Sequence, residues 1–277
     1  MIKNGIIFSH SRRSNNTEKP SIVKKTFLPL IAGCISISFA FAPIFKSSKA
    51  SAATASASVN SVVTSSANEA KVVNEESSAV AAATLLYDSL DLESLGLSRE
   101  AAIYAYKGFQ KLSNNGSLRN ENILTVVDFS QPSDKKRMYI IDVKNFKVLV
   151  NTYVAHGKNT GLQKATNFSN TPESLQSSLG FYVTKNTYIG KHGLSLRLEG
   201  LEKGFNDKAM ERAIVVHGAN YIGSHRLGSP YMGRSFGCPA VPQELSAKVI
   251  NYIKDGTCLF IYHPSKSYLH GSKILNG

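Results

Sequence analysis

The residues best suited to chemistry are a cysteine and a histidine in the C-terminal part of the chain. Cys238 lies in the stretch "GRSFGCPAVP", behind Gly237 and ahead of Pro239, in a segment typical of a tight turn. A structural cysteine usually lies among apolar neighbours, whereas a thiol displayed on a Gly/Pro turn is accessible for reaction. We therefore predict that Cys238 is a nucleophile.

A cysteine nucleophile needs a base or cation that favours the thiolate and donors for an oxyanion. His217 ends the strand-like run "AIVVHGA", so a rigid element would hold it, and Gly218 permits a close approach. Gly237 lets backbone N–H groups turn toward a tetrahedral intermediate. His156 also ends a strand before a glycine and is a candidate substrate-side residue. From the residues alone, the choice of histidine stays open.

A zinc site is the alternative use of these residues. His217, His225 and Cys238 are possible ligands, but the chain has no HExxH or CxxC motif. No acidic residue lies between Ala213 and Gln243 to compensate the charge of a cation. The sequence therefore disfavours a metal site.

The elements that would position these residues are mostly strands. From residue 122 onward, short runs rich in Val, Ile, Tyr and Thr are broken by Asn, Gly, Ser and Pro, with a hairpin turn at Lys144-Asn145. One helix is predicted over 242–256, and a strand follows at "CLFIYHP", in which Cys258 is a buried small hydrophobe. Upstream, Ser98 is placed to cap a helix. The predicted fold is mainly β, with a few peripheral helices and an N-terminal helical prelude.

The chain divides into five predicted parts. Residues 1–46 are a signal peptide or membrane anchor, and 47–82, rich in Ala, Ser, Val and Asn, are a low-complexity tether. The helical prelude covers 83–120, the catalytic domain 121–265, and a C-terminal tail 266–277.

The leader combines a basic start, an uncharged run of 20 residues from Thr26 to Phe45, and small residues after it. These are the parts of a cleaved export signal. An uncleaved anchor and a lipoprotein signal, lipidated at Cys34 of "IAGC", are the alternatives. All three predict export to the periplasm or cell envelope, and the last two add a membrane contact.

The net charge of the chain indicates which classes of partner would bind it. The formal net charge is +13, and residues 1–50 hold eight of the Lys and Arg residues against one acid. The remaining positive charge suits an anionic partner such as an acidic wall polymer. Zinc-finger spacing, a basic helix and an RNA-binding aromatic signature are all missing from the sequence, which argues against nucleic acid.

The pairing of "VVHGA" with "SFGC" resembles the L,D-transpeptidase catalytic domain of the YkuD type. Its signature is a His, roughly seventeen residues, and then Ser/Thr-His-Gly-Cys; here His217 is followed by residues 218–234 and then by Ser235 to Cys238. The residues around the cysteine resemble more closely the murein L,D-transpeptidase branch, whose cysteine motif is Arg-Ser-x-Gly-Cys-Pro-Ala. In this sequence the motif runs from Arg234 to Ala240. "AHGKNTG", "SLRLEGLEKGFND" and "RAIVVHGANYI" extend the resemblance to about residues 84–264.

The resemblance implies a β-sandwich or barrel with the cysteine at the mouth of a groove, and peptidoglycan stem peptides as substrate. It implies no metal or organic cofactor, and we expect a monomer. Cys238 would be the nucleophile and His217 its base, oriented by a backbone carbonyl near Gly218. Amides around Gly237 and Cys238 would form the oxyanion hole, and Ser235 would brace the loop.

Two positions depart from the common family motif. Phe236 replaces its histidine, which leaves His217 as the base, and Phe236 becomes a substrate-side residue. Pro239 and Ala240 stand where an arginine commonly follows the cysteine, so we assign the grip on a stem-peptide carboxylate to Arg234 or Arg226.

The predicted function is L,D-transpeptidation through a Cys238 thioester. The same acyl-enzyme resolved by water would instead make an L,D-carboxypeptidase or endopeptidase, and sequence does not separate the two. A non-catalytic wall-binding protein is the alternative of another class. Acylation of Cys238 by a carbapenem-type β-lactam, implied by the family resemblance, would discriminate against it.

Overall fold

The computed structural model describes residues 63–277, with side chains described from residue 76 onward. The predicted leader, with Cys34, and residues 47–62 of the predicted tether lie outside the described residues. Between residues 63 and 277, no helix has both the length and the hydropathy needed to cross a membrane.

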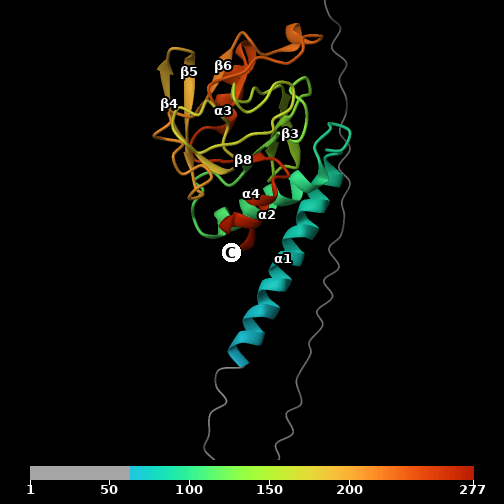
Figure 1. The fold of residues 1–277 in the computed structure, drawn as a ribbon. Coiled ribbons are helices and arrows are strands. Elements are labelled where there is room, and N and C mark those ends of the chain that lie inside the picture. The colour runs from blue at the N-terminus through green and yellow to red at the C-terminus, as the bar shows by residue number, and fades with distance from the viewer. Residues whose placement is uncertain (1–62) are drawn as a thin grey trace, which may run out of the picture. The chain divides into compact units, whose positions relative to one another are not determined.

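The prediction of a mainly β fold is confirmed, because eight strands form a single sheet in the order β3-β2-β1-β8-β4-β5-β6-β7 (Figure 1). The pairs β1–β8 and β6–β7 are parallel, and the remaining neighbours are antiparallel. The strands are β1 Ile123–Asp128, β2 Met138–Asp142, β3 Lys147–Thr152, β4 Gly180–Gly190, β5 Gly193–Gly200, β6 Val215–Ala219, β7 Ala240–Pro242 and β8 Cys258–Tyr262.

The sheet curves until its two ends meet, which makes it a nearly closed barrel. Just beyond β3, Ala155 N donates to Ala240 O at 2.8 Å, so the chain after one edge strand pairs with the other edge strand. Helix α3, Gln243–Ile253, contacts β1 and β2 as well as β5, β6 and β7. A helix that contacts strands near both ends of the strand order requires a sheet that wraps around it.

Two N-terminal helices pack together, and the second of them packs against strands β1 and β8 of the barrel (Figure 1). Helix α2, Arg99–Asn114, begins as predicted at Ser98, whose Oγ accepts from Ala101 N at 3.2 Å. Helix α1, Val63–Ser89, differs from the prediction, since it takes in residues 63–82 of the expected tether. Its sequence has no glycine or proline and is rich in alanine, the strongest helix former, and its last turns bury Leu86 and Tyr87.

The C-terminal residues, predicted as a tail, are part of the domain. They form α4, Lys266–Gly271, and α5, Lys273–Asn276, beside α2 (Figure 1). The buried carboxylate of Glu202 holds them, accepting from Tyr268 Oη at 2.8 Å and from Ser272 Oγ. Phe181 N is its third donor, at 2.8 Å. Burial raises the pKa of Glu202.

Removing residues 266–277 is therefore expected to lower the free energy of unfolding by at least about 3 kcal/mol. The truncation exposes the site of Tyr268 and leaves Glu202 with one of its three donors. Urea unfolding followed by circular dichroism measures the effect. Lys266→Ala, at an exposed position of α4, is the control, and an unchanged midpoint in the truncated chain would contradict the assignment.

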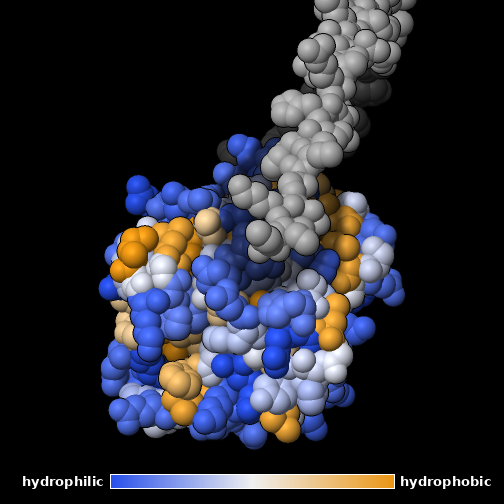
Figure 2. Space-filling model, turned by 90° about the horizontal axis from the view of Figure 1, so that it is seen from above, coloured by the Kyte–Doolittle hydropathy of each residue, from blue (hydrophilic) through white to orange (hydrophobic). Residues whose placement is uncertain are grey.

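The surface of the domain is largely hydrophilic on the face shown in Figure 2, where hydrophobic residues form small patches separated by polar ones. Among the described residues, large apolar side chains with more than half of their area exposed are few. They are Leu85, Leu162, Ile189, Leu227 and Phe236. One of them, Phe236, adjoins the predicted nucleophile.

Candidate active site

The two predicted catalytic residues come from the neighbouring parallel strands β6 and β7. His217 lies opposite Ala240 in the register of this pair. Cys238 precedes Ala240 by two residues, so the pairing brings its thiol beside the start of β6. There, Val215 N donates to Cys238 Sγ at 3.5 Å, and the thiol faces Ala213 O at 3.8 Å.

The imidazole of His217 is buried and held in one orientation. Its Nδ1 lies 2.9 Å from Gly218 O, the backbone carbonyl contact that the family resemblance implied. Because a carbonyl can only accept, Nδ1 carries the proton and Nε2 is left with the lone pair of a base. Gly218 has a packing role, since a Cβ there would lie 2.7 Å from Gln243 Oε1 and from Ser246 Oγ of α3.

The thiol and the imidazole are both neutral at rest. Burial raises the pKa of Cys238, although Val215 N–H and the charge of Arg212 partly offset this. Burial also lowers the pKa of His217, and the neighbouring His192 lowers it further. Within the described residues, no hydrogen bond joins the two groups. The arrangement favours proton transfer during nucleophilic attack over a preformed thiolate–imidazolium pair.

Ser235 braces the cysteine turn from inside. Its Oγ donates to Cys238 O at 2.6 Å and accepts from Gly237 N at 3.1 Å. Its backbone is tied to the strand extension, with Ser235 N donating to His156 O at 2.9 Å and Lys158 N donating to Ser235 O at 2.7 Å. The turn is thus fixed from Ser235 to Cys238, the predicted nucleophile.

Gly237 is required by geometry. Its φ of +122° is unfavourable for other residues, and a Cβ would lie 2.7 Å from Gln176 O. The expected oxyanion hole is altered in one respect, because Gly237 N already donates to Ser235. Among the described residues, the amide of Cys238 has no partner, so it is the donor of this turn that remains for an oxyanion.

His156 does not face the site as predicted. It is fully buried, with Nδ1 accepting from Arg137 Nη2 at 2.8 Å and Nε2 donating to Gly161 O at 3.2 Å. Burial, reinforced by the Arg137 charge, lowers its pKa to about 4. The ring is therefore a neutral internal brace closed to substrate, and its backbone carbonyl holds Ser235.

The predicted substrate-side residues are placed differently from one another. Phe236 is 72% exposed on the turn, where a substrate would meet it. Arg234 turns away to stack on Tyr231, 4.5 Å from the ring centroid, and donates to Lys158 O at 3.0 Å. Arg226 ends the short helix η1, Ser224–Arg226, and its buried Nε has no partner within the described residues.

Two residues near the thiol were not predicted. Arg212 is close enough to Cys238 to affect its pKa, and its Nη2 would lie 3.2 Å from a Cβ at Gly237. The thiolate charge in turn adds to the burial that raises the pKa of Tyr221 to about 12. Both lie in "RAIVVHGANY", so their signal was closeness in sequence to His217.

Arg212 also fixes the loop beside the cysteine turn. It donates to Ser169 O at 2.8 Å, to Gln176 O at 2.5 Å and to Ser178 Oγ. A cation in this position supports an anionic sulfur and any carboxylate that binds near it.

His192, at the tip of the β4–β5 hairpin, stacks on His217 with ring centroids 4.3 Å apart. The stack covers the His217 ring, and any positive charge on His192 disfavours a second on His217. His192 is itself exposed, so it adds little to the core, and its effect is on the pKa of His217.

Replacing His192 by alanine is expected to raise the pKa of His217 toward its ordinary 6.5, because one source of its depression is removed. The acid limb of kcat/KM should then move to higher pH, with stability changed by less than about 0.5 kcal/mol. A pH profile measures this shift. His225→Ala is the matched control, and an acid limb that stays in place or moves to lower pH would contradict the prediction.

A zinc site needs several His, Cys, Asp or Glu side chains close together. In the part of the chain that the structure describes, no three such residues are grouped to hold a metal. His225, one of its three proposed ligands, has Nε2 2.9 Å from Asn220 O. Cys238 and Cys258 are both free, and Cys258 is buried as predicted.

Comparison with solved structures gives several similar chains. An L,D-transpeptidase from Mycobacterium smegmatis matches with 13% identity and a TM-score of 0.32, covering 51% of this chain and 59% of that one. An L,D-transpeptidase from Stackebrandtia nassauensis has 13% identity and a TM-score of 0.29, and the match covers 60% of this chain and 68% of that one. L,D-transpeptidase 3 from Mycobacterium tuberculosis has 13% sequence identity and a TM-score of 0.29, and the match covers 51% of this chain and 61% of that one. This chain thus spans less than two thirds of the length of the Mycobacterium smegmatis protein and of L,D-transpeptidase 3.

No curated protein sequence matches this chain. The model of one family does, and its description is the L,D-transpeptidase catalytic domain. The match covers residues 93–262, more than half of the chain, and includes every strand of the barrel and both His217 and Cys238. The chain therefore belongs to the L,D-transpeptidase catalytic-domain family.

Proposed function

We propose that this chain is an exported cysteine acyltransferase that remodels peptidoglycan by L,D-transpeptidation. The observation that carries the proposal is the Ser235-braced turn, which presents Cys238 beside the strand of a histidine whose tautomer is fixed. An accessible thiol, a base with a free Nε2 and an unpaired amide are the parts that acyl transfer needs.

The acylation half proceeds at the amide between the diamino acid at stem position three and the terminal D-alanine. As the Cys238 sulfur bonds to the carbonyl carbon, His217 Nε2 takes the thiol proton. The oxyanion is stabilised by the Cys238 amide. When the intermediate collapses, the C–N bond breaks and His217 returns the proton to the departing amine, so D-alanine leaves and a thioester remains.

The second half resolves the thioester. A neutral amine of a neighbouring stem attacks the same carbonyl carbon, and His217 takes a proton from that amine. The C–S bond breaks, the sulfur leaves as thiolate, and the imidazolium reprotonates it. The product is a direct cross-link between two stems, and the enzyme is restored without a net change of protons.

The charges near the thiol suit an anionic stem. Arg212 and Arg234 both donate hydrogen bonds within the protein, but it is the charge of Arg212 that lowers the pKa of the Cys238 thiol against the effect of burial. Arg212 therefore joins Arg226 as a candidate for the grip on a stem carboxylate. Export, through a signal in residues 1–46, is part of the proposal because the substrate lies outside the cytoplasmic membrane, and the basic surface suits acidic wall polymers.

The test is incubation of the full chain with tetrapeptide muropeptides, followed by mass spectrometry of the products. Cross-linked dimers with loss of D-alanine support transpeptidation. Trimmed stems without dimers would assign the hydrolytic alternative to the same acyl-enzyme. Muropeptides retained without any reaction would favour a wall-binding protein.

A further inference from the structure

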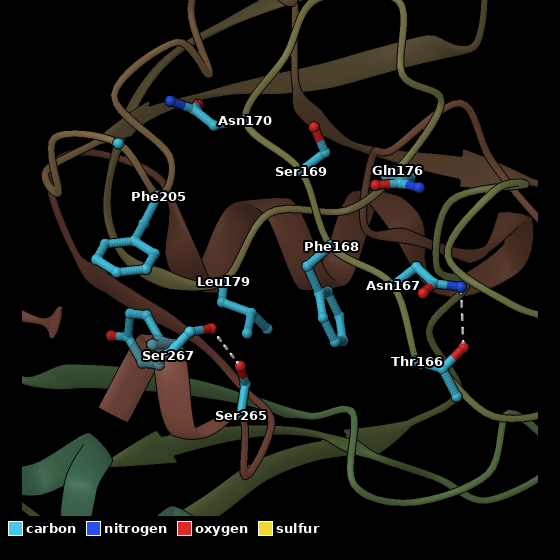
Figure 3. Close-up of a pocket in the computed structure, with 12 residues that line it drawn as sticks. Thr166, Asn167, Phe168, Ser169, Asn170, Gln176, Leu179, Phe205, Ser265 and Ser267 are labelled. Carbon is cyan, nitrogen blue, oxygen red and sulfur yellow. Dashed lines mark hydrogen bonds between the residues drawn. The ribbon is translucent and has the colours of Figure 1, made fainter. Parts of the chain in front are cut away.

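A second site lies next to the cysteine turn. It is a cavity of about 490 Å³, within the size range of ligand pockets, bordered by the loop 166–179, by residues 204–205 and by the start of α4 (Figure 3). One residue connects it to the catalytic turn. The side chain of Gln176 lines the cavity, while its carbonyl accepts from Arg212 and closely approaches Gly237.

The lining is entirely uncharged. All twelve residues around the cavity are polar-neutral, apolar or glycine, although the chain as a whole carries a net charge of +13. A carboxylate or phosphate would need a cation or several aligned donors to replace its water. The cavity therefore suits a neutral ligand, unlike the acidic stem peptide that the cysteine would attack.

Apolar groups form one part of the lining. Phe168, Leu179 and Phe205 project between the polar side chains of the loop and those of α4 (Figure 3). The rings are held in place, since Phe205 packs edge-on against Tyr268 with centroids 5.2 Å apart and Phe168 lies 4.9 Å from the ring of His263. Half-buried aromatic rings of this kind pack against the C–H face of a sugar ring.

Amides and hydroxyls form the other part. Asn167 donates to Thr166 Oγ1 at 3.2 Å, which leaves its carbonyl oxygen facing the cavity. Ser265 and Ser267 share a hydrogen bond of 2.9 Å and keep further hydroxyl capacity. Within the described residues, the side-chain amide of Gln176 has no partner. These groups can bond both the hydroxyls and the acetamido group of an amino sugar.

Hydrogen bonds from outside the cavity hold its wall in place. The Glu202 network seats Tyr268 in the core, and Arg212 fixes the loop through Ser169 and Gln176. A preformed cavity costs little ordering on binding, which favours recognition of a flexible polymer.

We propose that this cavity binds a neutral N-acetylhexosamine unit of the glycan strand that carries the stem peptide. This rests on the proposed function, in that it takes peptidoglycan as the substrate. The glycan would occupy the cavity while its stem reaches Cys238 past Gln176. The site would then favour stems still attached to their glycan over free peptides.

Binding is tested without turnover, using the full chain with Cys238→Ala and chitotetraose, a neutral chain of N-acetylglucosamine, as the probe. Isothermal titration calorimetry should show saturable binding. Gln176→Ala and Phe205→Leu should each weaken it about tenfold or more, as expected for loss of one well-placed contact. Tyr252→Ala, at an exposed aromatic position outside the cavity, should leave it unchanged.

Steady-state kinetics distinguish an effect on glycan binding in the cavity from an effect on the reaction at Cys238. With Cys238 present, Phe205→Leu should raise KM for glycan-linked stems and leave kcat/KM for a free stem tetrapeptide unchanged. Absence of chitotetraose binding, binding that the cavity variants do not weaken, or displacement by the free tetrapeptide would overturn the inference. Lack of turnover by the unmodified chain would instead overturn the proposed function and leave a measured saccharide site standing.

Discussion

Replacing Cys238 by alanine is expected to abolish release of D-alanine and formation of dimers, with a loss of at least about 10³-fold, because the covalent step has no other nucleophile. The fold should be retained, since Cys238 is only partly buried and Ser235, which braces its turn, does not bond to the sulfur. The change removes one acceptor, the sulfur that accepts from Val215 N. Mass spectrometry of muropeptide digests measures the loss.

The matched control is the other free thiol among the described residues. Cys258 lies in β8, fully buried, and burial strongly raises its pKa. Cys258→Ala should keep turnover, at a small cost in stability for the methyl-sized cavity. A carbapenem should add its mass to the unmodified chain and to Cys258→Ala, but not to Cys238→Ala. Unchanged product formation by Cys238→Ala would exclude the proposed mechanism.

The second large effect is expected at His217. His217→Gln removes the base while keeping a side chain of similar length, and kcat/KM at neutral pH should fall by about 10²- to 10⁴-fold. The thiol must then ionise unaided, and its pKa lies above its ordinary value of 9.0. The residual rate should therefore rise about tenfold per pH unit through pH 9, following the thiolate fraction.

The unmodified chain should behave differently across the same range. A base works when unprotonated, and because burial lowers the pKa of His217, its ring stays unprotonated to lower pH than an ordinary imidazole does. The chain should thus retain its activity at mildly acidic pH, where a thiolate without a base would be scarce. Parallel pH profiles of kcat/KM compare the two. If both proteins showed the same pH dependence, His217 would not be the base.

The sequence alone predicted the chemistry and the local elements. A thiol on a Gly/Pro turn marked Cys238, and a strand running into His-Gly marked His217. The hydrophobic pattern marked the strands of the barrel except the short β7, which lies within the predicted turn. The cap at Ser98 was equally readable. These signals arise within a few residues of one another, where backbone propensities, turn residues and capping act.

Other features needed the folded chain. The position of His156 at the end of a strand, before a glycine, predicted a substrate-side residue, yet its ring is buried against Arg137. Nothing local indicated that the last twelve residues would be held by Glu202, or that His192 would stack on His217.

The proximity of the two predicted catalytic residues was also decided by the tertiary structure. His217 and Cys238 are brought close by the parallel register of β6 and β7, which joins residues on either side of a long connection. Arg212 and the uncharged cavity depend on the loop 166–179 lying against that turn. Such contacts follow from packing between segments distant in sequence, and the free energy that selects them comes from burial across the whole barrel, which no short stretch of residues contains.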